Sequence, residues 1–198
     1  MAVRKQHVKQ SGYYFITFTC YKWLHLFQET DSYDLVYKWF RYLDNNGQRI
    51  VGYVIMPNHL HLLMAYKENE KSLNTIIGNG KRFLAYGIVA RLKEAGKVHL
   101  LGTLAGGVIS SDEARGKKHE VFEESFEVKQ CKTNKFLVQK LEYIHNNPLS
   151  NRWLLVTDRA IYRHSSASYY DTGVQSMHSV SSWLELEAMG WWEQAVVQ

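Results

Sequence analysis

The sequence is poor in cysteine, with only Cys20 and Cys131 among its 198 residues. Two thiols so far apart form no disulfide framework, and no Cys-x-x-Cys pair exists, so a reducing compartment is expected. The sequence also lacks any run of about 18 apolar residues, which excludes a predicted membrane-spanning helix. Residues 1–14 are polar and basic without an apolar segment, so no secretory signal is expected. These absences predict a soluble, cytoplasmic protein without a membrane partner.

The residues that are present suit a globular domain with a polyanionic partner. Apolar residues make up 45% of the chain, which is enough for one good core, and 22% charged residues argue against global disorder. The formal net charge is +5, a mild basic excess that favours nucleic acid without proving it. Aromatic residues reach 14%, and although they can stack on nucleobases, most are expected in the core.

The order of the predicted elements is β-α-β-β-α-β-α. Runs of β-branched and aromatic residues predict strands at 13–20, 49–56, 59–66 and about 126–129. Apolar residues at helical spacing predict helices at 32–43, 72–94, about 134–146 and 181–196. The short break at Pro57 and Asn58 predicts an antiparallel hairpin between the second and third strands. This order is typical of an α+β, ferredoxin-like domain, an antiparallel sheet with helices on one face, here followed by a C-terminal helical extension.

Glycine marks two irregularities along this pattern. Gly78 and Gly80 lie within the helix predicted at 72–94, where they indicate a kink or a close approach. Residues 96–119 contain five glycines and are expected to be irregular, as an insertion or mobile loop. The predicted domain therefore covers residues 1–175 with an insertion at about 96–119, and residues 176–198 form the extension.

Two histidines begin the third predicted strand. Positions i and i+2 of a strand face the same side, so His59 and His61 project together. Two imidazoles on one sheet face can bind a divalent metal. A chance His-x-His pair is common in a chain with nine histidines, so this spacing alone is weak evidence.

A second candidate group lies at the end of the helix that precedes Pro148. Residues i and i+4 of a helix share a face, so the Tyr143 phenol and the Asn147 amide point the same way. A buried tyrosine followed by an ordinary helix end is the alternative interpretation of this segment.

Taken together, the two segments resemble a known family. Residues 53–63 (YVIMPNHLHLL) and 143–149 (YIHNNPL) are similar to the two signature stretches of the single-tyrosine HUH transposases, and more closely to the REP-associated tyrosine transposases. HUH stands for histidine, hydrophobic residue, histidine. Residues 162–168 (YRHSSAS) resemble the Tyr-x-x-Ser-Ser tract of this branch. The resemblance covers about residues 10–170, apart from the insertion.

The resemblance implies a ferredoxin-like fold and a metal-dependent endonuclease and strand transferase acting on single-stranded or hairpin DNA. In that family the histidine pair holds Mg²⁺ or Mn²⁺, and the tyrosine forms a 5′-phosphotyrosine link that leaves a free 3′-OH. Carried over to this sequence, His59 and His61 are metal ligands, Tyr143 is the nucleophile and Asn147 is the third ligand. Asn146 is the nearest competitor, but it is turned about 100° from Asn147 around the helix. The sequence leaves open whether the protein is a monomer or a homodimer whose subunits exchange the helix that carries Tyr143, here called the tyrosine helix.

The sequence departs from the family pattern before the tyrosine helix. Relatives often carry a tryptophan-rich, basic stretch there, whereas this chain has Glu120, Glu123, Glu124 and Glu127. Carboxylates repel phosphates, which motivates a second hypothesis, a domesticated, non-catalytic protein that binds DNA or RNA hairpins on the same fold. A third hypothesis, a small metallohydrolase unrelated to DNA, rests on the histidine pair alone. No base that would activate Tyr143 is evident from the sequence.

Basic residues outside the two motifs are candidates for DNA contacts, with a solvated surface charge as the alternative for each. Their binding to phosphates would weaken with salt. The candidates are Lys81, Arg82, Arg152, Arg163 and His164, with Lys117 and Lys118 as further ones.

Overall fold

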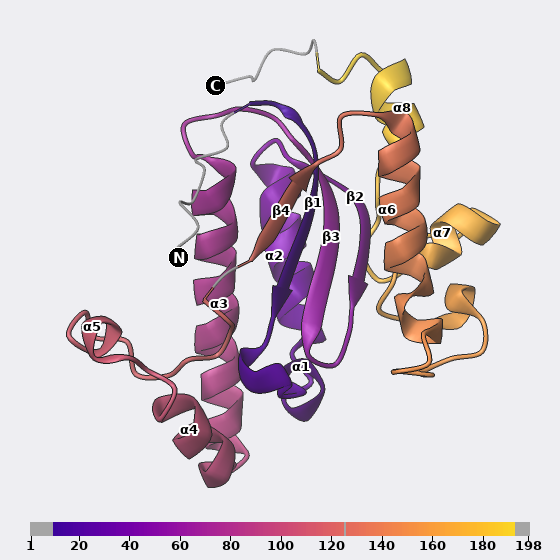
Figure 1. The fold of residues 1–198 in the computed structure, drawn as a ribbon. Helices are drawn as coiled ribbons and strands as arrows, with labels where there is room; N and C mark the ends of the chain where they lie inside the picture. The colour runs from indigo at the N-terminus through magenta and orange to yellow at the C-terminus, as the bar shows by residue number, and fades with distance from the viewer. Residues whose placement is uncertain (1–9, 125, 193–198) are drawn as a thin grey trace.

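The computed structural model describes residues 10–124 and 126–192. Its centre is a four-stranded antiparallel sheet of order β2-β3-β1-β4 (Figure 1). The strands are β1 (Gly12–Thr19), β2 (Arg49–Ile55), β3 (His59–Tyr66) and β4 (Glu127–Gln130). The α+β class and the β2–β3 hairpin predicted from the sequence are confirmed.

Helices connect and cover the strands. The principal ones are α2 (Tyr33–Asn45), α3 (Leu73–Glu94) and α6 (Asn134–Asn146). The side chains of Ser72 and Thr133 cap α3 and α6 by accepting backbone N–H bonds at the first turn. The shorter helices are α1 (Leu26–Glu29), α4 (Val98–Ala105), α5 (Ser110–Glu113), α7 (Ala167–Thr172) and α8 (Trp183–Ala188), with 3-10 turns η1 (Tyr21–Trp23), η2 (Asn147–Leu149) and η3 (Arg159–Ile161).

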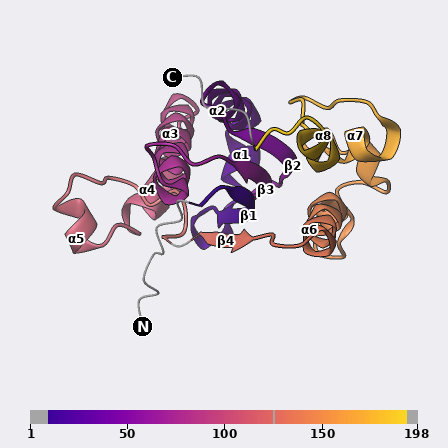
Figure 2. The same cartoon turned by 90° about the horizontal axis from the view of Figure 1, so that it is seen from above.

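The sheet is covered on both faces. Helices α2 and α3 lie on one face, as expected, whereas α6 lies on the other together with α7 and α8 (Figure 2). All eight residues of β3 are buried, because alternate side chains of this inner strand enter two separate apolar clusters. The cluster under α6 includes Phe15, Val54, Leu63, Leu141 and Ile144. The odd-numbered positions of β1 and β3 therefore face the tyrosine helix.

Two expectations about the chain after α3 need correction. Residues 96–119 were expected to be irregular, but they contain α4 and the short α5. Helix α4 forms because leucines 100, 101 and 104 share a helical face that packs on the apolar cluster under α2 and α3. The helix predicted at 181–196 is shorter, since α8 ends before Gly190, whose φ of 58° is left-handed. The last part of that prediction, 193–196, lies outside the described residues. Nowhere in residues 10–124 and 126–192 is a helix long and apolar enough to span a membrane.

Helix α3 runs without interruption through Gly78 and Gly80. Of the two features expected at these glycines, the structure therefore contains the close approach and not the kink. A Cβ atom added at Gly80 would lie 2.3 Å from the buried ring of Trp39, whereas one added at Gly78 would meet nothing within 4 Å. Gly80 therefore allows α2 and α3 to pack closely.

These two glycines form a matched pair for a stability measurement. We expect Gly78→Ala to raise the free energy of unfolding by about 0.5–1 kcal/mol, because alanine favours the helix. Gly80→Ala is expected to lower it by about 1–3 kcal/mol through the clash with Trp39. Urea unfolding followed by circular dichroism measures both, and equal effects of the two substitutions would contradict this packing.

Candidate active site

His59 and His61 lie on the face of the sheet that α6 covers. Their ring centroids are 4.7 Å apart, and each side chain is almost fully buried. In the strand register His61 is opposite Thr17 on β1 and Val54 on β2, so the pair is fixed within three strands. The shared orientation predicted from the i, i+2 spacing is present.

Each imidazole has a polar partner at Nδ1. Asn58 Nδ2 donates to the carbonyl oxygen of Trp23 at 2.9 Å, which leaves Asn58 Oδ1 as the acceptor 2.7 Å from His59 Nδ1. His59 therefore carries its proton on Nδ1 and presents the lone pair of Nε2. Thr17 Oγ1 lies 2.7 Å from Nδ1 of His61, and the tautomer of the histidine decides which of the two atoms donates. Such outer partners orient the histidine ligands of metal sites.

Burial keeps both imidazoles uncharged. It lowers the pKa of His59 to about 4, an effect that a hydrogen bond with Asn147 opposes and the charge of Arg152 reinforces. Burial, together with the neighbouring His59 and Lys140, also places the pKa of His61 well below its ordinary value. Neutral imidazole is the form that binds metal ions.

Helix α6 places Tyr143 and Asn147 over the two histidines within the same chain. The ring of Tyr143 lies 5.0 Å from that of His61, and half of its side chain is exposed. Asn147 lies close enough to His59 to affect its pKa. Asn146, the competitor for the ligand position, instead contacts Glu142 and Arg159. The structure therefore brings together the four residues that the sequence had singled out.

Two lysines flank the tyrosine. The Lys140 ammonium lies 5.4 Å from the centre of the Tyr143 ring and 4.3 Å from that of Phe15. An ion pair with Glu127 raises the pKa of Lys129 on β4, and the neighbouring Tyr143 adds to this shift. The phenol of Tyr143 thus faces solvent beside positive charge.

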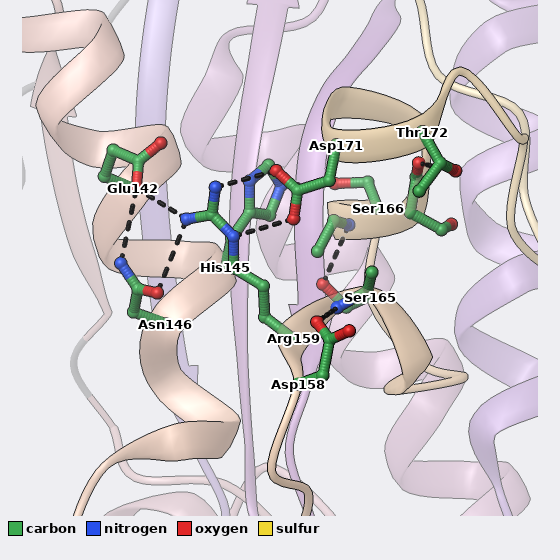
Figure 3. Close-up of polar contacts among 12 residues, drawn as sticks. Glu142, His145, Asn146, Asp158, Arg159, Ser165, Ser166, Asp171 and Thr172 are labelled. Atoms are coloured by element: carbon green, nitrogen blue, oxygen red, sulfur yellow. Dashed lines mark hydrogen bonds and ion pairs between the residues drawn. The ribbon is translucent and has the colours of Figure 1, made fainter.

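Polar contacts fix α6 to the segment that follows it (Figure 3). Arg159 of η3 forms two hydrogen bonds with Asp171 of α7, at 2.7 and 2.8 Å, and pairs with Glu142 of α6. Such bidentate pairs have a defined geometry. On the sheet side, a Cβ atom at Gly52 would lie 2.5 Å from the side chain of Leu141, so the helix rests directly on β2.

The third motif, residues 162–168, supports this arrangement from beside β2. Ser166 Oγ is 2.9 Å from His145 Nε2 of α6 and also accepts the backbone N–H of Tyr53. The Tyr162 hydroxyl donates to the carbonyl oxygen of Ile55. The tract therefore links the tyrosine helix to the strand next to the histidines.

The predicted DNA-contacting residues are dispersed over the molecule. Arg152 lies next to His59, and its guanidinium carbon is 4.2 Å from the centre of the Trp23 ring. Lys81 and Arg82 belong to α3 on the opposite face of the sheet, where Lys81 donates to the carbonyl oxygen of Glu123. His164 stacks on Tyr33 with ring centroids 3.7 Å apart, and Arg163 before it is exposed. Contact with DNA stays a prediction for all five.

Three of the remaining basic and acidic candidates form ion pairs. Lys117 forms ion pairs with Asp112 and Glu120, and Glu127 pairs with Lys129. The acidic stretch before α6 is therefore partly neutralised. Because Glu127 is opposite Thr17 in the sheet register, its side chain still belongs to the face that carries the histidines.

The donor set of this site is two imidazoles and one amide. Over the residues the structure describes, no group of three or more histidine, cysteine, aspartate and glutamate side chains is placed to hold a metal ion. Asn147, whose residue type is outside that set, lies beside His59 and stays the predicted third ligand. Imidazole nitrogens suit Zn²⁺ better than Mg²⁺ or Mn²⁺, which prefer oxygen ligands, so either of the two predicted ions would need phosphate oxygens and water to complete its shell.

Sequence reasoning missed several residues of this site. Lys140 precedes Tyr143 by three positions, so helical spacing alone could have placed both on one face. Thr17 is 44 positions from His61 and became a partner only through strand register, for which the sequence gives no local signal. Asn58 directly precedes the histidine pair, and its bond to His59 does not follow from the strand break or from the signature stretch to which it belongs.

Comparison with known proteins supports the fold. No family model matches the sequence, and no curated protein matches it significantly. A solved structure of a REP-associated tyrosine transposase bound to a REP hairpin matches 92% of this chain and 93% of its own, with a TM-score of 0.58 and 14% identity. A protein assigned as a transposase from Deinococcus radiodurans R1 covers 74% of this chain and 97% of its own, with 16% identity and a TM-score of 0.33, too low to support an inference. The first comparison shows that this chain has the fold of that transposase.

Proposed function

We propose that this protein is a metal-dependent endonuclease and strand transferase that acts on single-stranded or hairpin DNA through a 5′-phosphotyrosine intermediate. The observation that supports this most is the position of Tyr143 beside His61, with Asn147 beside His59, all in one chain. The shared fold adds to it, since the transposase of similar structure was solved with a REP hairpin bound.

The chemistry is a transfer of one phosphodiester bond. The Tyr143 oxygen forms a bond to phosphorus and loses its proton, the bond to the 3′-oxygen breaks, and that oxygen leaves as a 3′-OH after taking up a proton. The bond energy is retained in the phosphotyrosine, so a 3′-OH can reverse the step or accept the strand. The half-exposed ring of Tyr143 allows a DNA strand to approach its hydroxyl.

The residues that would hold the metal ion are His59, His61 and Asn147. A bound Mg²⁺ or Mn²⁺ would neutralise charge on the phosphate oxygens and orient the phosphate. Because Asn58 and Thr17 lie at Nδ1 of the two imidazoles, Nε2 is the nitrogen of each ring that would bind the ion.

Covalent trapping tests the proposal. The full-length protein is incubated with a single-stranded hairpin oligonucleotide and Mn²⁺, with EDTA as the control, and the products are separated on a denaturing gel. We expect an adduct only when the label is on the 3′ side of the cut, and peptide mass spectrometry of that band should place the nucleotide on Tyr143. Hairpin binding without an adduct or cleavage in any metal would instead favour the non-catalytic hairpin-binding protein.

Lys140 is expected to assist the transfer by placing positive charge next to the phosphate that Tyr143 attacks. Lys140→Met keeps a long, unbranched side chain at this position but removes the positive charge that lies over Phe15. We expect single-turnover cleavage to fall about 10- to 100-fold, which is at or below the lower end of the effect of a buried donor directed at developing charge, because Lys140 is only partly buried.

The matched control is Lys135→Met, an exposed lysine at the start of the same helix, which should cleave like the wild type. Calorimetric Mn²⁺ binding should be unchanged or slightly tighter in Lys140→Met. Equal cleavage rates for the two variants would show that Lys140 has no part in the reaction.

A further inference from the structure

Two tryptophans lie beside His59, on the opposite side of the histidine pair from Tyr143. The ring centroid of Trp23 is 5.9 Å from that of His59, and the ring centroid of Trp153 is 5.7 Å away. Trp23 is 46% exposed, whereas Trp39 and Trp191 in the apolar clusters are 3% and 5% exposed. Core packing therefore does not account for the position of Trp23.

The backbone holds Trp23 in this exposed position at an energetic cost. Lys22 and Trp23 have φ values of 50° and 59°, and a left-handed conformation costs about 1 kcal/mol or more for each residue other than glycine. Glu123 accepts the N–H of Lys22, and Asn58 donates to the carbonyl of Trp23. Because Asn58 also bonds His59, one amide fixes the tryptophan relative to the histidine pair.

Positive charge accompanies the exposed indole. The guanidinium of Arg152 lies over the Trp23 ring at 4.2 Å, and Arg152 is exposed. Within residues 10–124 and 126–192, no carboxylate forms an ion pair with it. An exposed cation stacked on an exposed aromatic ring can accept both a phosphate and a base.

We infer that Trp23, Arg152 and Trp153 form a binding site for an unpaired nucleotide of single-stranded DNA, next to the scissile phosphate. Its base stacks on an indole ring and its phosphate contacts Arg152, an arrangement that tolerates any base because every base has an aromatic face. The inference rests on the proposed function, since the histidine pair marks where the scissile phosphate lies. It differs from the phosphate contact predicted for Arg152 alone, because it requires an unpaired base.

Equilibrium binding tests this site without cleavage. A fluorescein-labelled single-stranded oligonucleotide is titrated with full-length protein in EDTA, and anisotropy gives the Kd at several salt concentrations. We expect Trp23→Ala to weaken binding about 10-fold or more and Trp23→Phe to restore most of it, as stacking predicts. Arg152→Met should reduce the slope of log K against log salt by about one, since one phosphate contact is lost.

The control is Tyr86→Ala, which removes a tyrosine that is 72% exposed on α3, and it should bind like the wild type. If Trp23→Ala unfolds, which circular dichroism detects, Trp23→Phe and Arg152→Met still test the site. No single-strand binding by the wild type, or wild-type binding in both Trp23→Ala and Arg152→Met, would overturn the inference. If binding depends on Trp23 but no covalent adduct forms, the proposed catalysis is wrong and the nucleotide-binding site stands. If an adduct forms but binding does not depend on Trp23, the nucleotide-binding site is wrong and the proposed catalysis stands.

Discussion

Replacing Tyr143 with phenylalanine is expected to abolish the protein–DNA adduct and to lower strand cleavage about 1,000-fold or more, because the attacking oxygen is deleted. The phenyl ring would retain its edge-on contacts with His61 and Phe15. Stability should therefore change by less than about 0.5 kcal/mol, as for other exposed substitutions. Single-turnover cleavage on denaturing gels and thermal unfolding measure the two effects.

The outcomes of that substitution separate the functional hypotheses. Tyr86→Phe, an exposed tyrosine on α3, serves as the control and should cleave normally. Cleavage by Tyr143→Phe at the wild-type rate would mean that water is the nucleophile, as in a metallohydrolase. Loss of both adduct and cleavage, with hairpin affinity intact, fits the tyrosine as nucleophile.

Local pattern was sufficient for the part of the site that lies within single elements. The two histidines share a face because β3 is a regular strand, and Tyr143 and Asn147 share one because Asn147 keeps helical φ and ψ at the end of α6. Pro57 and Pro148 end elements at the expected places. These features depend on residues within a few positions of one another, where spacing determines direction.

Contacts between segments that are far apart in the chain could not be predicted from the sequence. The placement of α6 on the second face of the sheet depends on Gly52, which has no side chain and admits Leu141, and on the Arg159 contacts with α6 and α7. Trp23 is exposed because its backbone is left-handed, a conformation that is unfavourable for tryptophan. Neither follows from composition or periodicity, since each results from which segments meet in the fold.

The arrangement of charge around the histidine pair is compatible with the proposed DNA substrate despite the acidic neighbour. Lys140 and Lys129 lie on the tyrosine side and Arg152 on the tryptophan side of two uncharged imidazoles. Glu127, the acidic residue on this face, is held by Lys129. A phosphate over the histidines would therefore meet positive charge on both sides.

Removing one of the two imidazoles is expected to have a large effect on metal affinity, as removing the Tyr143 hydroxyl has on cleavage. We expect His61→Ala to weaken Mn²⁺ binding about 100-fold or more, because the substitution removes a metal ligand. Loss of a residue that only hydrogen-bonds to a ligand already lowers metal affinity about 10- to 100-fold. Isothermal titration of the DNA-free protein measures this directly. His99→Ala, an exposed histidine on α4, is the control and should bind Mn²⁺ like the wild type.

Thr17→Val shows whether such a loss reflects coordination or packing. His61 lies between Phe15 and Tyr143, so His61→Ala also leaves a cavity that lowers stability. Valine nearly matches threonine in shape but removes the oxygen at His61 Nδ1, so the imidazole keeps its neighbours and loses its orientation. An affinity about 10-fold below the wild type, between those of the wild type and His61→Ala, is expected. Unchanged Mn²⁺ affinity in both variants would place the ion elsewhere, because no metal held by His61 could be indifferent to both changes.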